Sequence, residues 1–196
     1  MYPNTIINLI NDFKKIPSIG EKSAERFVLH IISKYTKTEI EDFSKHLLEI
    51  NSKLKKCPVC GMLIDTNSCY ICEDKSRHLD TLMIVSEIKD VYLIERTNAY
   101  HGLYHVLGGE IDYSRGIDEK KLAIETLIVR LKETKEVILA LNNTLQGELT
   151  SKYLKALLEK SGIKVTKLAS GIPYGTDLRY TDELTLKEAF NNRKEF

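Results

Sequence analysis

The chain has 196 residues, enough for one medium domain or for two or three small ones. Hydrophobic residues make up 42% and charged residues 29%, which is ordinary for a globular protein. No apolar run approaches the roughly 20 residues that span a bilayer, and the first residues lack a signal-peptide pattern, so we expect a cytoplasmic protein with no membrane partner. The net charge of +1 gives no global sign of a nucleic-acid partner, although residues 1–56 hold ten Lys and Arg against seven Asp and Glu.

Residues 1–56 are predicted to form three amphipathic helices that make up a helix-hairpin-helix domain. A short turn from Ile16 to Gly20, which contains Pro and Gly, separates the first two helices. Apolar side chains recur at helical spacing within residues 6–13, 24–32 and 40–54.

The start of the second helix is a candidate DNA-binding site. Free backbone N–H groups and the helix dipole favour an anion there, such as a DNA phosphate. Lys22 and Arg26 lie four residues apart on one helical face and could contact a phosphate without reading sequence. A plain helical hairpin with solvated basic side chains explains this stretch equally well.

Four cysteines in residues 57–79 predict a zinc finger. Cys57, Cys60, Cys69 and Cys72 form two C-x2-C pairs separated by eight residues, so that two tight turns can place four thiolates around one Zn²⁺. Gly61 suits the left-handed backbone that such a turn requires. Four thiolates leave no position for water or substrate, so the zinc would be structural. Two redox-active dithiols, or four free cysteines in a core, are the alternatives.

The pattern changes to alternating strands and helices in residues 80–175, which favours a mostly parallel sheet covered by helices. From Thr176 onward, residues 176–196 read as a strand-like stretch and a short helix without a core of their own. Strands are predicted at residues 81–85, 103–107, 137–141 and 165–169, and helices at 90–96, 118–133 and 149–160.

The ends of two predicted strands carry the residues of a candidate metal site. Glu87 follows the first strand, and the third strand is followed by Asn142, Thr144, Gly147 and Glu148. This arrangement resembles a Toprim domain, whose enzymes use a Glu and a D-x-D-x-x-G motif at these places to hold Mg²⁺ for phosphoryl transfer. Neutral amide and hydroxyl groups stand here at both Asp positions, so we expect no catalysis. Glu87 and Glu148 could still bind a metal weakly, or be ordinary surface acids.

The order of these parts resembles the RecR family of bacterial recombination mediators over essentially the whole chain. The fold class is then α+β and multidomain, with a helix-hairpin-helix, a four-cysteine zinc finger, a Toprim-type domain and a short C-terminal assembly segment. The phrases that carry the likeness are residues 16–24, the two cysteine pairs, and residues 102–109, 142–150 and 171–175.

The resemblance implies a protein without catalytic activity that assembles into a tetrameric ring around DNA. Such proteins bind single- and double-stranded DNA without sequence preference and act with RecO, and in many bacteria RecF, to load RecA onto single strands. By position, Lys22 and Arg26 would contact DNA, and Glu87 and Glu148 would contact RecO. A Mg²⁺-dependent Toprim nuclease or primase is the alternative, and a transcription-associated zinc module without a clamp role is a third.

Four departures from the family pattern bear on these expectations. Ser18 stands where the family usually has Gly in the hairpin, and Gln146 replaces a usual Glu after the third strand. Thr176 replaces a common Gly in the tail, and residues 110–116 lack the usual Pro-containing loop. None of these positions is a cysteine of the predicted zinc site.

Overall fold

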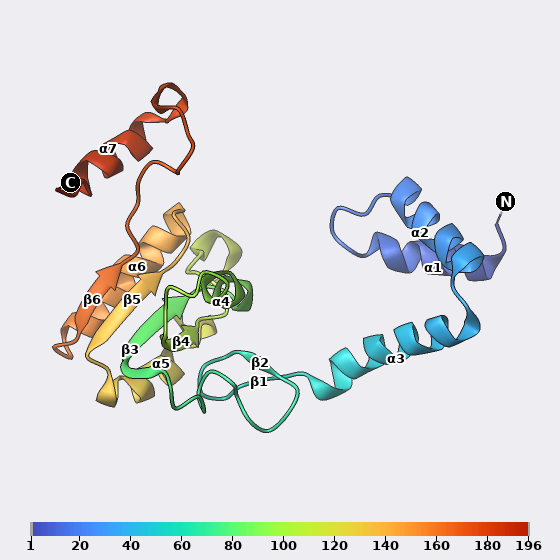
Figure 1. Ribbon diagram of the computed structural model, residues 1–196, viewed down its shortest axis with the longest axis horizontal. Coiled ribbons are helices and arrows are strands. Elements are labelled where there is room, and N and C mark those ends of the chain that lie inside the picture. Colours follow the sequence, from blue (N-terminus) through green and yellow to red (C-terminus); the bar gives the residue numbers. More distant parts are fainter. Residues whose placement is uncertain (1, 196) are drawn as a thin grey trace. The chain divides into compact units, whose positions relative to one another are not determined.

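The computed structural model describes residues 2–195, which fall into two compact units (Figure 1). The first unit ends at Leu54 and the second begins at Lys55. The cysteine segment and the predicted Toprim segment therefore pack as one body, while the division of the chain at residues 56, 79 and 175 stays a prediction. No helix in the described part of the chain has the length and apolarity needed to cross a membrane.

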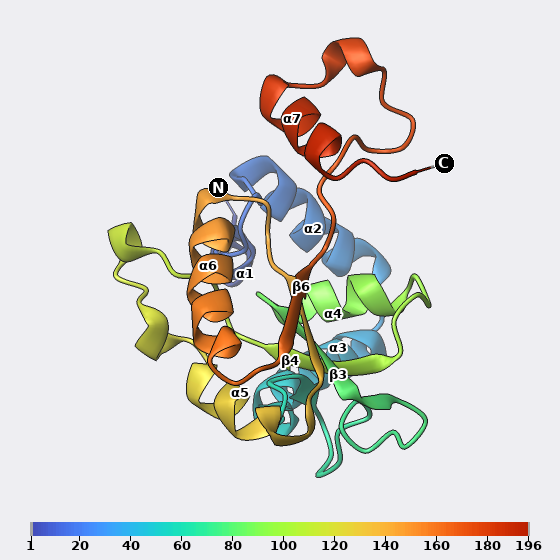
Figure 2. The same ribbon diagram turned by 90° about the vertical axis from the view of Figure 1, so that its left-hand side faces the viewer.

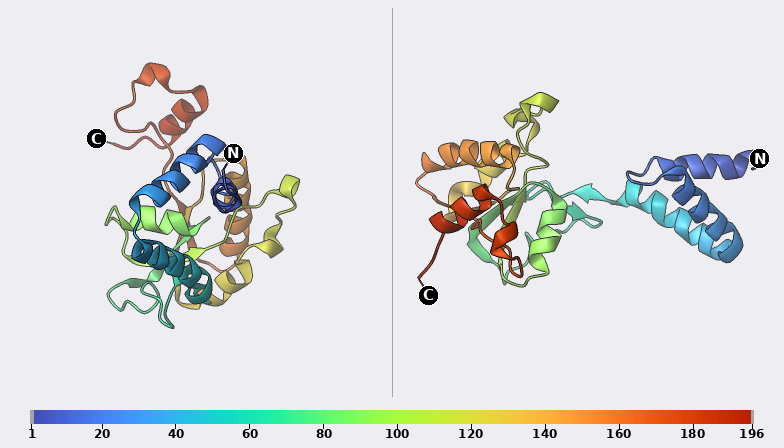
Figure 3. Two further views of the ribbon diagram at one scale, coloured as in Figure 1. Left: turned by 90° about the vertical axis from the view of Figure 1, so that its right-hand side faces the viewer. Right: turned by 90° about the horizontal axis from the view of Figure 1, so that it is seen from above.

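The first unit contains the three predicted helices: α1 (Asn4–Lys14), α2 (Glu21–Lys34) and α3 (Lys37–Lys53). The α1–α2 hairpin, seen from above in Figure 3, encloses a small core. Ile10, Ala24 and Val28 are buried at its centre, and partly buried apolar residues surround them.

Helix α3 starts at a capping box and leaves its apolar side chains exposed. The Thr36 hydroxyl accepts a hydrogen bond from the Glu39 backbone N–H at 3.3 Å, and the Thr36 N–H donates to the Glu39 carboxylate at 2.7 Å. None of the 17 residues of α3, all of them described, is buried. Its predicted apolar face is present and stays exposed alongside residues 2–36.

A four-stranded parallel sheet forms the centre of the second unit, as predicted. Its strand order is β4-β3-β5-β6, with helices in the connections. The elements are β3 (His78–Val85), α4 (Ile88–Glu95), β4 (Gly102–Val106), α5 (Ile124–Arg130), β5 (Glu136–Ala140), α6 (Leu145–Glu159) and β6 (Lys164–Lys167).

Alternate residues of the strands enter two cores on opposite faces of the sheet. Helices α5 and α6 cover one face and α4 covers the other (Figure 2). Leu82 and Ile84 of β3 pack with α5 and α6 on one face. Met83 and Val85 pack on the other face with α4 and the cysteine segment. A strand that is buried on both faces needs a continuous apolar run, and this run predicts the strand at residues 81–85 from the sequence alone.

Two predicted elements were wrong in extent or type. The helix expected at 118–133 is shorter: the Asp118 carboxylate accepts from the Lys121 N–H at 3.2 Å and closes a 3-10 turn, and extended backbone at Leu122 separates that turn from α5. The strand-like stretch of the tail is instead a 3-10 turn, Leu178–Tyr180, which is followed by α7 (Glu183–Asn191). In both places an aspartate side chain, Asp118 or Asp177, accepts a backbone hydrogen bond and stabilises a 3-10 turn in place of the predicted element.

Candidate functional site

The four cysteine sulfurs lie together in one cluster. All of them are within 4.8 Å of one another, and the Cys60 and Cys69 sulfurs are 3.5 Å apart. A tetrahedral Zn²⁺ with Zn–S bonds of about 2.3 Å would place its sulfurs about 3.8 Å apart. The cluster thus has the donor set and the spacing of a four-thiolate metal site.

A glycine turn brings the first cysteine pair into position. The Gly61 N–H donates to the Cys57 carbonyl at 3.0 Å, and the Cys57 N–H donates to the Met62 carbonyl at 2.7 Å. Gly61 has a φ of 80°, so the left-handed backbone expected there is confirmed. A Cβ at this position would also lie 3.0 Å from the Val106 carbonyl oxygen, so two independent constraints require glycine.

Binding of a cation to this cluster would have to displace protons from its thiols. A hydrogen bond with Cys72, together with burial, raises the pKa of the Cys60 thiol. Four adjacent thiolates in a buried place would repel one another, and a divalent metal offsets that repulsion while displacing the thiol protons.

The cysteine segment is joined to the sheet at edge strand β4. It includes a short antiparallel pair, β1 (Lys55–Lys56) and β2 (Leu63–Ile64). The Cys60 carbonyl accepts a hydrogen bond from the Val106 N–H at 2.8 Å, at the end of β4. At the start of β4, the Arg77 guanidinium donates to the Gly102 carbonyl at 3.1 Å.

Arg77 also forms a two-pronged ion pair that ties this segment to α4. Its two terminal nitrogens lie 3.1 and 2.6 Å from the two carboxylate oxygens of Glu95. The Tyr104 hydroxyl donates to the same carboxylate at 2.7 Å. The hydrogen bonds from Arg77 lower the pKa of Glu95, which therefore stays ionised in this partly buried place.

The helical hairpin of the first unit presents both predicted DNA-binding side chains. Lys22 and Arg26 are exposed on α2, and the Arg26 guanidinium lies 5.6 Å from the ring centre of Phe27. Two neighbouring acids are already engaged: Glu21 pairs with Lys14 at 3.0 Å, and Glu25 accepts a hydrogen bond from the Tyr2 hydroxyl. The Lys14 ammonium offsets the charge of Glu21, whereas the neutral Tyr2 hydroxyl leaves the charge of Glu25 in place.

The backbone at Ser18 adopts a conformation that glycine takes up more easily than serine. Its φ is 68°, in the left-handed region that costs a residue with a Cβ roughly 1–2 kcal/mol. The Ile19 N–H donates to the Ile16 carbonyl at 3.1 Å and closes the turn around it. The serine keeps the turn but strains it.

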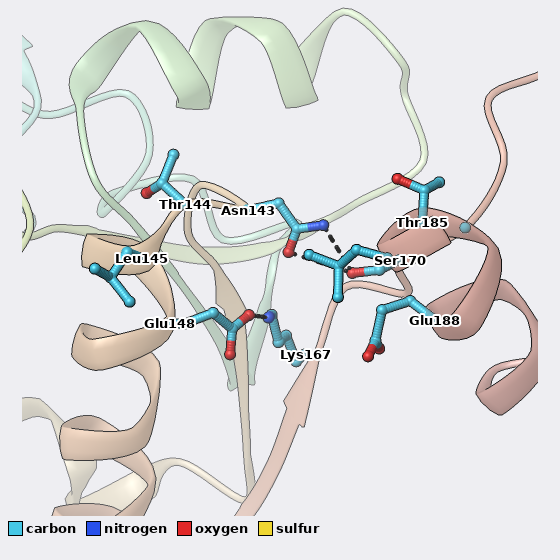
Figure 4. A pocket seen from close by; sticks show the side chains of 10 residues that line it. Asn143, Thr144, Leu145, Glu148, Lys167, Ser170, Thr185 and Glu188 are labelled. Carbon is cyan, nitrogen blue, oxygen red and sulfur yellow. Dashed lines mark hydrogen bonds and ion pairs between the residues drawn. The ribbon is translucent and has the colours of Figure 1, made fainter. Parts of the chain in front are cut away.

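The carboxyl ends of the parallel strands bring the Toprim-like residues to one edge, as the topology requires. Glu87 follows β3 at the start of α4, is exposed, and pairs with Lys89 at 2.8 Å. Glu148 lies in the first turn of α6 and forms an ion pair with Lys167 of β6 (Figure 4). The two predicted partner-binding acids are therefore on the same edge but on different helices.

At this edge Asn142 and Thr144 surround a carboxylate that sequence reasoning missed, that of Glu110. Its Oε1 accepts hydrogen bonds from the Ser86 hydroxyl at 2.6 Å and from the Asn142 backbone and side-chain nitrogens, each at 2.9 Å. Its Oε2 accepts from the Thr144 hydroxyl at 3.3 Å. Glu110 follows Gly108 and Gly109 after the end of β4, so its place beyond a strand end was the signal that could have found it.

A pocket of about 570 Å³ opens beside the same edge. It lies between the start of α6, the end of β6 and helix α7, and Figure 4 shows Glu148 and Lys167 on one side and Thr185 and Glu188 on the other. Asn143 and Ser170 join the two strand ends through a hydrogen bond of 3.0 Å. Two carboxylates and one lysine give the lining of this pocket a net negative charge.

Comparison with known proteins identifies the family. Residues 80–169 match the model of the Toprim domain, and residues 171–194 match the model of the RecR C-terminal region. The recombination protein RecR of Phytoplasma mali is 46% identical over 98% of this chain and 95% of its own length. The chain belongs to the RecR family. RecR of Staphylococcus haemolyticus is 43% identical, over 99% of this chain and 98% of its own, and RecR of Clostridium perfringens is 42% identical, over 98% and 97%.

Membership of the RecR family confirms the resemblance and implies a role in recombination repair. The Toprim match contains Glu87, Glu110 and Glu148, and the C-terminal match contains α7 and the second side of the pocket. The predicted fold class is confirmed as well, including the parallel sheet and the cysteine cluster.

His105 of this RecR-family chain is a core residue whose two ring nitrogens are both hydrogen-bonded within the protein. It is 1% exposed, its Nε2–H donates to the Ala123 carbonyl at 2.7 Å, and its Nδ1 accepts from Arg130 at 3.3 Å. These two partners fix one neutral tautomer. Burial lowers the pKa of His105 to about 4, so the ring is uncharged at neutral pH.

Proposed function

We propose that this protein is a non-enzymatic recombination mediator of the cytoplasm. It forms a tetrameric ring around DNA and acts with RecO, and with RecF where the cell has one, to load RecA onto single strands. Zn²⁺ at Cys57, Cys60, Cys69 and Cys72 stabilises its fold.

The composition of the strand-end edge carries this proposal. A hard divalent cation needs carboxylate charge, and the two positions after β5 that would supply it are Asn142 and Thr144. The carboxylate that lies between Asn142 and Thr144, that of Glu110, already accepts four hydrogen bonds. An edge of this kind supports binding to a partner rather than phosphoryl transfer.

DNA binding is assigned to Lys22 and Arg26 of the hairpin. Both are exposed on α2 near its N-terminus, where backbone N–H groups attract anions. Contacts to phosphates release counterions, so binding should be weak in one subunit, salt-sensitive and indifferent to sequence, for single and double strands alike. A ring repeats the hairpin in every subunit and adds these contacts through effective concentration.

Exposed apolar side chains support the assembly into a ring. A helix of 17 residues that buries none of them gains little from its own unit, and Leu48 of α3 is 72% exposed. In the tail, Leu184 and Phe190 of α7 are 69% and 70% exposed. Contact with other copies of the chain would cover both surfaces, and native mass measurement with the metal retained gives the number of subunits.

RecO binding is assigned to Glu87 and Glu148. Glu148 and Glu188 line the pocket beside the edge, and the exposed Leu145 lies next to them. A partner that presents basic side chains flanked by apolar ones fits this surface, since opposite potentials steer association and fix the register of a complex.

The decisive experiment separates recruitment from catalysis. RecA filament growth on single strands coated with single-strand-binding protein should accelerate when this protein and RecO are both added. In parallel, the protein alone is tested with Mg²⁺ for DNA cleavage and primer synthesis. Turnover that Glu87→Gln abolishes would establish the alternative, a Mg²⁺-dependent Toprim nuclease or primase, and overturn the proposal.

The hairpin assignment has its own test. Lys22→Glu combined with Arg26→Glu should strongly weaken retention on DNA and reduce the salt dependence of the remaining binding. Lys37→Glu combined with Lys45→Glu makes the same charge change on α3 and should retain DNA. Equal retention by the two double variants would show that DNA binds elsewhere.

A further inference from the structure

The Glu110 carboxylate stands among polar groups that come from three separate strand ends. Ser86 follows β3, Glu110 lies in the loop after β4, and Asn142 and Thr144 follow β5. In a Toprim enzyme a divalent cation draws acidic side chains together at such an edge. In this protein the charges are reversed, because one central anion draws neutral donors together.

We infer that Glu110 is an internal cross-link that takes the structural place of a cation at this edge and positions the start of α6. A carboxylate offers about four lone-pair sites, and Glu110 accepts four hydrogen bonds. Three of them fall on Oε1, which leaves that oxygen no room for a metal. The hydrogen bonds of Glu110 thus tie the three strand ends together.

The surroundings of Glu110 fix it to α6 from both sides. The next residue, Ile111, donates its backbone N–H to the buried Thr150 hydroxyl of α6 at 2.9 Å. Gly147 of α6 packs so closely that a Cβ there would lie 1.9 Å from the Asn142 carbonyl oxygen and 3.1 Å from Glu110 Oε1. Because Glu148 is the next residue of α6, the cross-link sets where that side chain lies.

The polarity of the contacts gives the inference its test. Asn142→Asp would place a second carboxylate against Glu110, where the amide nitrogen now donates at 2.9 Å. Two carboxylates so close cannot both stay ionised without a counterion. We expect the melting temperature of Asn142→Asp at neutral pH to be roughly 4–10 °C below that of the wild type. Millimolar Mg²⁺ should reverse most of this decrease, because the two carboxylates together form a cation site.

The control is Asn143→Asp, which makes the same charge change one residue along. The Ser170 hydroxyl beside Asn143 can donate to the new carboxylate, so this variant should melt near the wild-type temperature with or without Mg²⁺. The wild-type protein should also be insensitive to Mg²⁺.

A second variant tests the donor–acceptor pattern rather than packing. Glu110→Gln combined with Asn142→Asp exchanges amide and carboxylate, so that the amide of residue 110 can donate to the carboxylate of residue 142. The double variant should be more stable than Asn142→Asp alone and should lose the response to Mg²⁺.

If Asn142→Asp melts like Asn143→Asp and does not respond to Mg²⁺, Glu110 is not the cross-link. If the double variant is no more stable than Asn142→Asp, the contact is not one of complementary polarity. Neither readout involves DNA or RecO, so a failure of the proposed function would leave these results unchanged.

Discussion

Replacing Cys60 by Ser should destabilise the whole second unit, not only the cysteine segment. Met62, Ile64 and Ile71 are at most 6% exposed and lie in one core with residues of β3 and β4. Burial of three such side chains contributes roughly 5–9 kcal/mol as an upper bound. Chain entropy released by the loosened segment offsets part of this, so we expect a net loss of about 3–5 kcal/mol.

Thermal unfolding followed by circular dichroism measures this loss directly. For a chain of this size it corresponds to a fall in melting temperature of roughly 10 °C, accompanied by loss of one bound zinc per chain. Ser68→Ala, beside Cys69 but with an exposed hydroxyl, is the matched control and should keep both the metal and the melting temperature. Metal-free wild-type protein, or a Cys60→Ser variant that melts at the wild-type temperature, would refute the structural role of zinc.

Three further predictions concern separate parts of the molecule. The pKa of His105 is lowered from 6.5 to about 4 in the folded protein, so the unfolded chain takes up a proton first and the free energy of unfolding falls as the pH drops from 6.5 to 4. In urea titrations over this pH range, the free energy of unfolding of His105→Gln should fall by roughly 3 kcal/mol less than that of the wild type. An identical pH profile for the two proteins would contradict the buried neutral ring. Ser18→Gly should raise the free energy of unfolding by about 0.5–1 kcal/mol, since it removes left-handed strain at the cost of chain entropy, and a lower value would mean that the serine is not strained. Lys167→Met removes the ion-pair partner of Glu148 and leaves that carboxylate free to bind RecO, so RecO titrations at low salt should show up to about fivefold tighter binding. Unchanged affinity would place RecO away from Glu148.

The sequence predicted the elements whose signal is local and repeated. The apolar run at residues 81–85 and the cysteine spacing each determine their structure almost alone, because burial on both faces and metal geometry leave few alternatives. The alternation of strands and helices predicted a mostly parallel sheet, whereas the strand order β4-β3-β5-β6 came from the structure. Gly61 was predicted for its backbone angle, but its contact with Val106 was visible only in the structure.

What the sequence did not reveal depends on partners distant in the chain. Glu110 lies 24 residues from Ser86 and 32 from Asn142, so its place after a strand end makes it a candidate but does not reveal which groups its carboxylate binds. The helix expected at 118–133 failed for the opposite reason, since Asp118 closes a local turn against an otherwise helical pattern. For Lys22 and Arg26 the structure gives exposure and surroundings, and their role stays a prediction.

The cysteine segment also changes how the sheet meets its surroundings. β4 is an outer strand, and the carbonyl of Cys60 and the guanidinium of Arg77 occupy hydrogen-bonding groups at its two ends. Unoccupied groups on an outer strand are a template on which other chains can add strands. Removal of the metal would therefore do more than loosen a turn, because it would open a flank of the sheet to aggregation.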